Sequence, residues 1–452
     1  MCHLVEKYNV PGPRYTSYPT VPYWDVENFS GLGWEQAVIK SYQQNKEEGL
    51  SIYVHLPFCE SLCTFCGCHK RITKRHEVEV PYIKAVVKEW QLYGELFSGR
   101  PVIKELHLGG GTPTFFTPEN LTRLIEGLIR NSTIHPKAEF SFEGHPNNTT
   151  TAHLKALYDL GFRRVSFGVQ DYNPKVQRAI NRIQPFEKVR EVTQMARQMG
   201  YTSVGHDLIY GLPFQTLDDV KNTIVRTQEL SPDRIAFYSY AHVPWRKGNG
   251  QRGYRTEDLP NPEEKQNQHE LGKRWLLGMG YKHIGMDHFA LGTDSLYEAL
   301  KKGSLHRNFM GYTASKTQLM IGLGVSSISD SWHAFAQNVK SIEEYQHLVD
   351  HDVIPVYRGH LLNQEDEIIR KHILNLMCHF ETSWTLHENS LIAMPKILDG
   401  LKELEADGLV VIGNDSLRVT EKGRPYIRNI AMAFDLKLQR NRSEKRLFSM
   451  TV

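Results

Sequence analysis

Between residues 50 and 240, short runs rich in β-branched and aromatic residues alternate with longer stretches in which apolar positions recur every three or four residues. The short runs are typical of buried strands, and the longer stretches are typical of amphipathic helices. The alternation repeats about every 30 residues, which is the length of a βαβ unit. The pattern predicts six strands, which begin at Ser51, Ile103, Ala138, Arg163, Ser203 and Arg234.

Helices are predicted between these strands, and several of them begin at Thr or Pro, which suit the first positions of a helix. Their expected ranges are 80–97, 118–130, 151–160, 186–199 and 217–230. Repeated strand-helix units wind into a barrel with its helices outside. With six such units, we predict an α/β chain built on an incomplete (β/α)6 barrel.

The rest of the chain divides around this barrel. We predict an N-terminal extension that covers the active site at residues 1–49, the barrel with the segments that follow it at 50–340, and a mostly helical C-terminal domain at 341–452. Residues 241–262 are rich in Gly, Arg and Pro, which predicts a long loop out of the barrel.

Within the C-terminal domain, helical patterns cover residues 365–380 and 393–408. Two β-rich runs then flank Gly413-Asn414-Asp415. This arrangement predicts a small hairpin, similar to that of a winged-helix unit.

The composition and net charge exclude some classes of protein. Hydrophobic residues at 40% and charged residues at 23% are ordinary for a globular protein. The net charge of +3 is far below that of a dedicated nucleic-acid binder, so we expect no nucleic-acid partner. No segment reaches the roughly 20 apolar residues of a membrane span, and the amino terminus has no signal-peptide pattern. We therefore expect a cytoplasmic protein with no membrane insertion.

Four of the six cysteines lie close together in PFCESLCTFCGC, directly after the first predicted strand. In a reducing compartment, such a group indicates metal or redox chemistry. Cys59, Cys63 and Cys66 have the spacing C-x3-C-x2-C, and three thiolates suit a 4Fe-4S cluster with one iron left open for a ligand. Two alternatives stay open, a zinc site with Cys68 as fourth ligand and a group of unrelated buried thiols.

Glycine and polar residues stand at the ends of the later strands. Gly109, Gly110 and Gly111 follow the second strand, where a glycine run lets the backbone approach a carboxylate or phosphate, although a tight turn is an alternative. The polar residues are Glu143, Gln170, Asp171, Asp207, Tyr240 and His242. Any one of them alone is explained as an ordinary strand-end cap. Because four successive strands repeat the pattern and barrel active sites assemble at this end of the strands, we predict a convergent pocket.

These motifs resemble those of the radical S-adenosylmethionine (SAM) superfamily and, within it, of the oxygen-independent coproporphyrinogen III oxidases. The likeness covers nearly the whole chain. It runs through YNVPGPRYTSYPT, YVHLPFCESLCTFCGC, LHLGGGTPT, FGVQDYNPKVQRAINR, DLIYGLPFQT, YAHVP, IGMDHFA, LHRNFMGYT, LGVSSIS and GRPYIRNIAMAFD.

The resemblance implies one 4Fe-4S cluster on Cys59, Cys63 and Cys66, with Cys68 present in the family's C-G-C ending but not a ligand. It also implies two SAM molecules. The first, bound to the open iron, would contact Tyr53, Gly110, Glu143 and Ile328. The second would contact Phe65, Gly111, Thr112, Gln170, Arg182, Asp207 and Ala241.

In this family an electron enters the iron–sulfur cluster, and SAM is cleaved to methionine and a 5′-deoxyadenosyl radical that removes a hydrogen from a propionate. Loss of CO2 and one electron leaves a vinyl group. Two rounds convert coproporphyrinogen III to protoporphyrinogen IX in haem biosynthesis, without oxygen. The resemblance thus implies coproporphyrinogen III and a low-potential electron donor as partners, and we expect a monomer.

The four propionates of this substrate predict a pocket with cationic side chains. The candidates are Arg14, Lys70, Arg71 and Arg307, and a solvated surface charge is the alternative for each. His55, Asp287 and His288 are candidates for positioning other groups or handling protons, with a structural role as the alternative. His145 departs from the family pattern, which leads us to expect an acidic residue before Pro146.

Two rival functions are a haem-binding chaperone and a haem-degrading radical SAM methyltransferase. Relatives that carry haem typically lack the PGPRYTSYP segment and the C-G-C ending, and this chain has both. The close match of the later motifs disfavours the methyltransferase.

Overall fold

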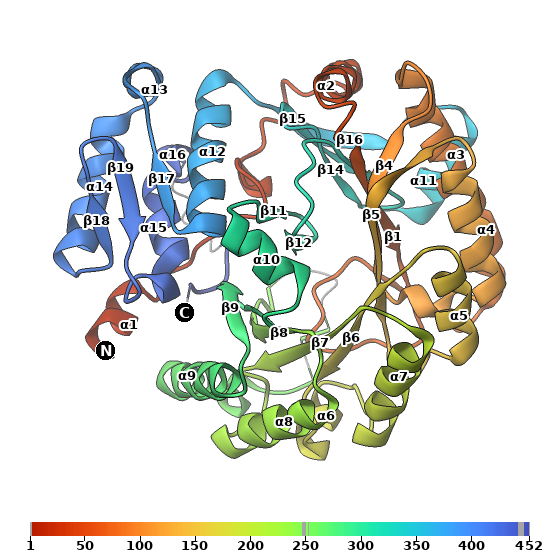
Figure 1. The fold of residues 1–452 in the computed structure, drawn as a ribbon, viewed down its shortest axis with the longest axis horizontal. Helices are drawn as coiled ribbons and strands as arrows, with labels where there is room; N and C mark the ends of the chain where they lie inside the picture. The colour runs from red at the N-terminus through yellow and green to blue at the C-terminus, as the bar shows by residue number, and fades with distance from the viewer. Residues whose placement is uncertain (1, 246–249, 252, 442–446, 452) are drawn as a thin grey trace.

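The computed structural model describes residues 2–245, 250–251, 253–441 and 447–451. At its centre, six parallel strands pair in chain order (Figure 1). They are β1 (Leu50–Leu56), β4 (Val102–Gly110), β5 (Thr133–Gly144), β6 (Arg164–Gln170), β7 (Ser203–Tyr210) and β8 (Arg234–Ser239). All six are strands that the sequence predicts, and the α/β class with a partial barrel is confirmed.

Further strands extend this sheet to twelve in the described part of the chain. On one side, β13 (Met320–Leu323) pairs parallel with β1, and β14 (Ile328–Asp330), β15 (Ala334–Asn338) and β16 (Val356–Leu361) follow as antiparallel strands. On the other side lie antiparallel β10 (His288–Ala290) and β9 (Lys282–Gly285). The sequence pattern does not reveal these strands, because three to six residues are too few for a period to stand out.

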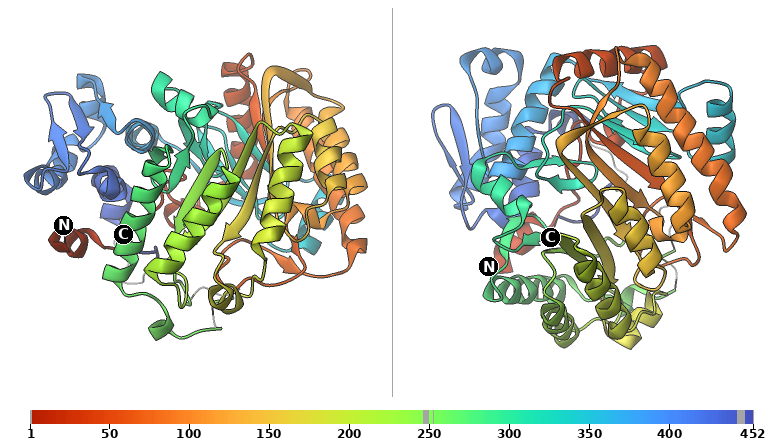
Figure 2. Two further views of the ribbon diagram at one scale, coloured as in Figure 1. Left: turned by 60° about the horizontal axis from the view of Figure 1, so that its bottom comes forward. Right: turned by 45° about the vertical axis from the view of Figure 1, so that its right-hand side comes forward.

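Five helices that the sequence predicts cover the outer face of the parallel strands (Figure 2). They are α3 (Glu79–Leu96), α4 (Pro118–Ile129), α5 (Thr151–Asp159), α7 (Phe186–Met199) and α8 (Leu217–Leu230), and α9 (Pro262–Gly278) packs beside α8. Thr117, Thr150 and Thr216 begin three of them, because each threonine side chain accepts a hydrogen bond from a backbone N–H of the first turn.

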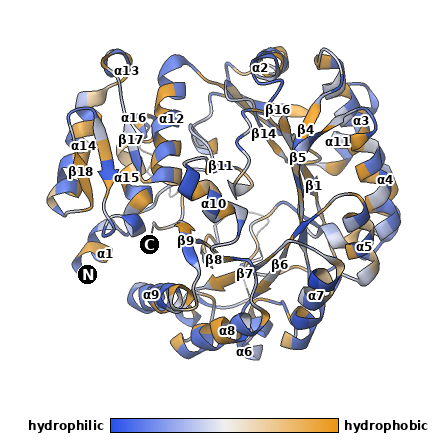
Figure 3. Cartoon of the chain, viewed as in Figure 1, coloured by the Kyte–Doolittle hydropathy of each residue, from blue (hydrophilic) through white to orange (hydrophobic). Residues whose placement is uncertain are grey.

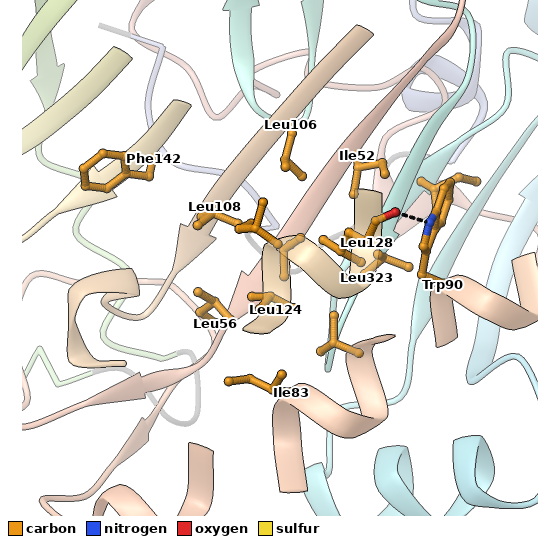
Figure 4. Packing of buried hydrophobic residues seen from close by; sticks show 14 of the residues in the cluster. Ile52, Leu56, Ile83, Trp90, Leu106, Leu108, Leu124, Leu128, Phe142 and Leu323 are labelled. Carbon is orange, nitrogen blue, oxygen red and sulfur yellow. Dashed lines mark hydrogen bonds between the residues drawn. The ribbon is translucent and has the colours of Figure 1, made fainter. Parts of the chain in front are cut away.

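The main hydrophobic core lies between the sheet and these helices (Figure 4). Ile52 and Leu106 point from the central strands, and Leu128 meets them from α4, all fully buried. Trp90 of α3 donates its Nε1–H to the carbonyl of Leu128 at 2.9 Å, which fixes the two helices together. Each such aliphatic side chain contributes about 1.5–3 kcal/mol by leaving water. The outer helices carry hydrophobic and hydrophilic positions in alternation (Figure 3), as amphipathic helices do.

A second core holds the C-terminal unit, on the left of Figure 1. It contains α12 (Gln364–His379), α14 (Met394–Ala406), α15 (Ile427–Phe434) and a small sheet of β17 (Glu381–Ser383), β19 (Ser416–Val419) and β18 (Val410–Ile412). The predicted helices and hairpin are confirmed, since β18 and β19 pair antiparallel. Tyr15 and Tyr18 of the N-terminal segment are buried in the same core, so both ends of the chain contribute to it.

The barrel sheet continues past residue 340, because β16 pairs with β15 and α11 (Ile342–Asp350) packs against α3. The division at 1–49, 50–340 and 341–452 stays a prediction about domains. In the loop predicted at 241–262, the described residues form one short 3-10 helix, η4 (Thr256–Asp258), before α9 begins. Residues 246–249 and 252 of this loop lie outside the described residues.

The remaining described elements are short or lie at the rim. They are α1 (Cys2–Tyr8), η1 (Val21–Tyr23), α2 (Gly31–Gln44), β2 (Phe58–Cys59), β3 (Arg71–Ile72), η2 (His76–Val78), η3 (Pro113–Phe115), α6 (Pro174–Ala179), α10 (Ser295–Lys302), β11 (His306–Asn308), β12 (Gly311–Thr313), α13 (Leu386–Leu391), η5 (Arg424–Tyr426) and α16 (Leu436–Arg440). None of the described helices has the length and apolar character needed to cross a bilayer.

A buried carboxyl group ties the early and late parts of the barrel together. Glu89 on α3 accepts hydrogen bonds from Gly324 N at 2.8 Å, Asn338 Nδ2 at 2.6 Å and Tyr345 Oη at 2.6 Å. These partners belong to the segments that follow β13, to β15 and to α11. Burial raises the pKa of Glu89 to about 7, although the three hydrogen bonds favour its charged form.

We expect Glu89 to make stability depend on pH. Its pKa is higher in the folded chain than the ordinary value of 4.5, so its contribution is fully present below that pH and is lost as pH rises through about 7. The loss is on the order of 3 kcal/mol. Thermal unfolding should therefore show that Glu89→Gln gains stability relative to the wild type as pH rises across this window.

Glu95→Gln is the matched control, since Glu95 lies exposed on the same helix. A difference between Glu89→Gln and the wild type that stays constant over the pH range would contradict the prediction.

Candidate active site

The predicted cysteine loop begins directly after β1. Its base is closed by β2 and β3, which pair in parallel so that Cys59 lies opposite Ile72. Cys59, Cys63 and Cys66 line one cavity of about 410 Å³. The middle of the loop is fixed by Thr64, whose hydroxyl donates to a backbone carbonyl at the end of α6 at 3.0 Å.

The glycine turn after β4 forms another wall of this cavity. A β-carbon on Gly111 would lie 2.7 Å from the backbone of Pro57, so a larger residue would push the cysteine loop away. Gly110 has φ of +115°, which strongly favours glycine. Thr112 places its hydroxyl 3.4 Å from Cys59 Sγ. The glycines therefore set how closely the turn and the loop approach.

Polar side chains from the next three strands face the same cavity. They are Glu143 on β5, Gln170 on β6 and Asp207 on β7. The Gly110 N–H donates to the Glu143 carboxylate at 3.3 Å. Burial first, and then the charge of Glu143, raises the pKa of Asp207 to about 7. One carboxyl group here can thus hold or release a proton near neutral pH.

Arg182 is a cationic residue that reaches the cysteines. Its Nη1 lies 3.8 Å from Cys63 Sγ, and its Nη2 donates to the Gly168 carbonyl at 2.7 Å. Its Nε donates to Gln184 Oε1 at 3.1 Å. A positive charge therefore lies beside the Cys63 sulfur.

The predicted site residues mostly gather around this cavity. Those that line it are Cys59, Cys63, Cys66, Phe65, Gly110, Gly111, Thr112, Glu143, Gln170, Arg182 and Asp207. Tyr53, Ala241 and Ile328 are not among its lining residues. The contacts of all these residues with cofactors stay predictions.

Tyr53 and Ile328 lie behind the glycine turn. A β-carbon on Gly109 would lie 3.0 Å from the Tyr53 ring. Tyr53 pairs in register with Gly322, and the backbone of Ile328 packs directly against that glycine. Ala241 follows β8, where its carbonyl accepts a hydrogen bond from a glutamine side chain at 3.0 Å.

The thiols differ in acidity. Hydrogen bonding from Cys68 lowers the pKa of Cys66 to about 6, and the charge of Lys70 acts in the same direction. Burial raises the pKa of Cys59 to about 11, against the hydrogen bond from Thr112. Because iron binds thiolates, binding must displace a proton from Cys59.

The donor set fits an iron–sulfur cluster. Among the described residues, no three Cys, His, Asp or Glu side chains converge on one point, as the ligands of a single ion do. A 4Fe-4S cluster spreads its thiolates over different irons, so its ligands surround a volume. Cys59, Cys63 and Cys66 would hold such a cluster at the wall of the cavity.

His145 stands where the family pattern leads us to expect an acidic residue. It lines the cavity, and its Nδ1 accepts a hydrogen bond from the Asn147 N–H at 3.1 Å. Burial, and then the charge of Arg182, lowers the pKa of His145 to about 2. A neutral imidazole therefore replaces the expected negative charge.

Sequence reasoning missed several polar residues that line the cavity. They are Lys74, Asn147, Asn148 and Asn181. Asn147 and Asn148 follow the end of β5 within a few residues, and the general position of barrel sites would have found them. Nothing in the pattern around Lys74 or Asn181 gives such a signal.

His55 has a structural environment, as the alternative interpretation held. Its Nε2 lies 2.9 Å from the His69 carbonyl, and its Nδ1 lies 3.1 Å from the Tyr53 hydroxyl. Burial lowers the pKa of His55 to about 4, so the ring is neutral and both nitrogens are used.

Two of the four predicted cations already have partners in the chain, Arg71 at the surface and Lys70 in the lining of the cysteine cavity. Arg71 forms an ion pair with Glu343 at 2.5 Å. Lys70 donates to the backbone carbonyls of Cys66 and Cys68, each at 3.2 Å. These contacts fix the end of the cysteine loop. Both cations are therefore already bound to other groups of the chain.

Arg14 and Arg307 lie on the other side of the barrel mouth. Arg14 forms an ion pair with Asp287 at 2.6 Å. Arg307 on β11 is buried, its Nη2 donates to the Arg14 carbonyl at 3.3 Å, and its guanidinium lies over the Tyr312 ring. Within the described chain, Arg307 Nε and Nη1 and the neighbouring His288 Nδ1 have no hydrogen-bond partner. A buried cation with unpaired N–H groups destabilises the folded protein unless an anion binds beside it.

Comparison with known proteins agrees with this geometry. Residues 53–226 match the Radical SAM superfamily. The oxygen-independent coproporphyrinogen III oxidase of Escherichia coli (strain K12) is 40% identical over 99% of this chain and 98% of its own length. That of Synechocystis sp. is 39% identical over 99% of this chain and 97% of its own length.

A solved structure gives the same result. The coproporphyrinogen III oxidase of Escherichia coli, described as a radical SAM enzyme, superposes with a TM-score of 0.89 at 38% identity. The match covers 96% of this chain and 98% of the other.

Serine substitutions of the four clustered cysteines should separate the iron–sulfur site from a zinc site. Cys59→Ser, Cys63→Ser and Cys66→Ser should each abolish the visible absorbance of the anaerobically reconstituted protein, because each removes a thiolate ligand. Cys68→Ser should retain iron and absorbance near the wild-type level. Loss of bound metal in Cys68→Ser to the same extent, with zinc as the metal found, would favour the four-thiolate zinc site.

Proposed function

The chain belongs to the oxygen-independent coproporphyrinogen III oxidase family of radical SAM enzymes, and on this basis we propose that it oxidatively decarboxylates two propionates of coproporphyrinogen III. The product is protoporphyrinogen IX, with two vinyl groups, and the reaction serves haem biosynthesis without oxygen. The observation that carries the proposal is the meeting of Cys59, Cys63 and Cys66 with the glycine turn and the polar strand ends in one cavity.

The cofactors proposed for this cavity are one 4Fe-4S cluster and two SAM molecules. When bound, they supply a 5′-deoxyadenosyl radical that removes a hydrogen from a propionate side chain. The residues proposed for the first SAM are Tyr53, Gly110, Glu143 and Ile328, and those for the second are Phe65, Gly111, Thr112, Gln170, Arg182, Asp207 and Ala241.

The chain's own residues would bind and orient the ligands. Gly110 and Gly111 let the backbone approach a ligand, and the Glu143 carboxylate can accept hydrogen bonds from an amine or a hydroxyl. Asp207 can hold a proton near neutral pH, because burial keeps its pKa at about 7.

A second, smaller cavity of about 140 Å³ lies between this site and residues that neighbour Arg307, although Arg307 itself does not line it. It shares Glu143, Ser166 and Asp207 with the cysteine cavity. Its lining also includes Tyr238, His288 and Tyr312, and the Arg307 guanidinium lies over the Tyr312 ring. We therefore assign Arg307 as the cation that receives a carboxylate of the substrate, since its Nε and Nη1 lack partners.

We further propose that the protein acts as a cytoplasmic monomer and takes electrons from a low-potential donor. These assignments rest on the family resemblance.

The test is an anaerobic assay of protein reconstituted with iron and sulfide, supplied with coproporphyrinogen III, SAM and a reductant. Mass spectrometry should detect protoporphyrinogen IX and about two 5′-deoxyadenosines per product. Cys66→Ser should form neither compound. SAM cleavage without decarboxylation would overturn the substrate assignment and keep the radical SAM chemistry.

The same preparation tests the rival functions. Stoichiometric haem on the purified protein, with no SAM cleavage from a full iron–sulfur cluster, would favour the haem-binding chaperone. Methylated, ring-opened products would favour the methyltransferase.

Arg307→Gln should weaken binding of the stable oxidised ligand coproporphyrin III by about tenfold to a hundredfold, because a charge-assisted pair is lost. Fluorescence titration measures this effect, and Arg307→Lys should recover part of it by restoring the charge. Arg71→Gln is the control, since Arg71 is already paired at the surface. Equal affinity of folded Arg307→Gln and the wild type would show that Arg307 does not hold the ligand.

A further inference from the structure

A separate cavity is lined by residues of the N-terminal segment, α9, the turn between β9 and β10, and the C-terminal unit. Figures 1 and 2 show the C-terminal end of the chain close to α9. The cavity measures about 60 Å³ and shares no lining residue with the cysteine cavity. Three of the motifs that make up the resemblance, YNVPGPRYTSYPT, IGMDHFA and GRPYIRNIAMAFD, meet here. None of them supplies a residue to the cysteine cavity.

The walls of this cavity are strongly cationic. Their charged residues are Arg14, Lys265, Lys273, Arg424 and Arg428, with Asp287 as the single carboxylate. These side chains come from the N-terminal segment, α9, the turn between β9 and β10, η5 and α15. Segments that are distant in the sequence therefore bring five positive charges and one negative charge to a small volume.

The pairing of these groups leaves a surplus of positive charge. Arg14 and Asp287 neutralise each other at 2.6 Å. Arg424 pairs with Glu421, which is exposed, and its buried Nε has no partner in the described chain. Lys265 donates to a backbone carbonyl at 3.2 Å, and neither it nor Lys273 has a carboxylate within ion-pair distance among the described residues.

Arg428 adds to this surplus of positive charge. Its guanidinium donates to the carbonyls of Gly12, Pro13, Met450 and Thr451, which joins the two ends of the chain. No carboxylate in the described chain pairs with it. Its N–H groups therefore have hydrogen-bond acceptors, but no carboxylate neutralises its positive charge.

The pKa values of the groups in this cavity agree with the excess of positive charge. Burial, and then the charge of Arg14, lowers the pKa of Lys265 to about 8 and that of Arg428 to about 9. His283 also faces the cavity, and burial lowers its pKa to about 4, so it adds no charge at neutral pH. His269 on α9 is the other histidine of the lining. An anion placed here would offset the repulsion among these cations.

We infer that this cavity binds a single oxyanion, a carboxylate or a phosphate, through Arg14, Lys265, Lys273 and Arg424. The volume of about 60 Å³ is far below the 410 Å³ of the cysteine cavity, so it suits one such group and not a macrocycle. The bound oxyanion joins the N-terminal segment, the barrel edge and the C-terminal unit. Its source is either a propionate of the substrate, which rests on the proposed function, or free phosphate.

The experiment titrates inorganic phosphate into the full-length protein by calorimetry and by thermal unfolding, with sodium chloride at equal ionic strength as reference. Phosphate should bind and raise the melting temperature more than chloride does. Lys273→Gln and Lys265→Gln should weaken phosphate binding by about tenfold to a hundredfold. Without phosphate, both variants should melt at or above the wild-type temperature, because each removes a repelling charge.

Lys282→Gln is the control, since Lys282 is exposed on β9 and does not line the cavity. Phosphate that binds no better than chloride, or that binds the lysine variants as tightly as the wild type, would overturn the inference.

A competition arm identifies the source of the oxyanion. Coproporphyrin III that displaces phosphate from the wild type assigns the cavity to a carboxylate of the substrate. Phosphate that stays bound beside coproporphyrin III assigns it to a free anion. If the proposed function failed, the assay with SAM would give no vinyl product, while phosphate binding would be unchanged.

Discussion

The backbone contact between Gly111 and Pro57 sets the geometry on which the active site depends. No side chain fits between them, so the turn after β4 and the loop after β1 approach to a fixed distance. Because β1 and β4 are neighbours in the sheet, this distance also places the thiols relative to the strands that follow. Glu143, Gln170 and Asp207 then extend the same rim, one strand after another. Because the strands are parallel and adjacent, this one close contact helps to position all the residues that line the cavity.

The sequence predicts the central part of this fold well because its signals are local. Each of the six parallel strands and five outer helices is long enough to show its own period, and threonines mark where several helices begin. The cysteine spacing and glycine run are local signals too. The short strands β9, β10 and β13 to β16 are defined by their neighbours, and a pattern of three to six residues does not encode those pairings.

The same distinction explains which of the predicted residues gather at the cavity. Those at the strand ends follow from the topology, since parallel strands bring their carboxyl ends together. The burial of Arg307 and the pairing of Arg71 with Glu343 depend on segments hundreds of residues apart, so four similar cations look alike in the sequence and differ in the structure. His145 is recognised as a departure from a pattern, but only its buried position beside Arg182 shows that it is neutral.

The joining of the two chain ends has a consequence for biosynthesis. Arg428 and the pairing of Pro11 with Met450 hold the first residues against the last ones. On the ribosome, the N-terminal segment emerges first and must wait for the final residues before it can take its place. The barrel strands and the cysteine loop are complete long before then. The N-terminal segment can therefore take its place only after Arg428 and Met450 have been made, whereas the barrel strands can pair before then.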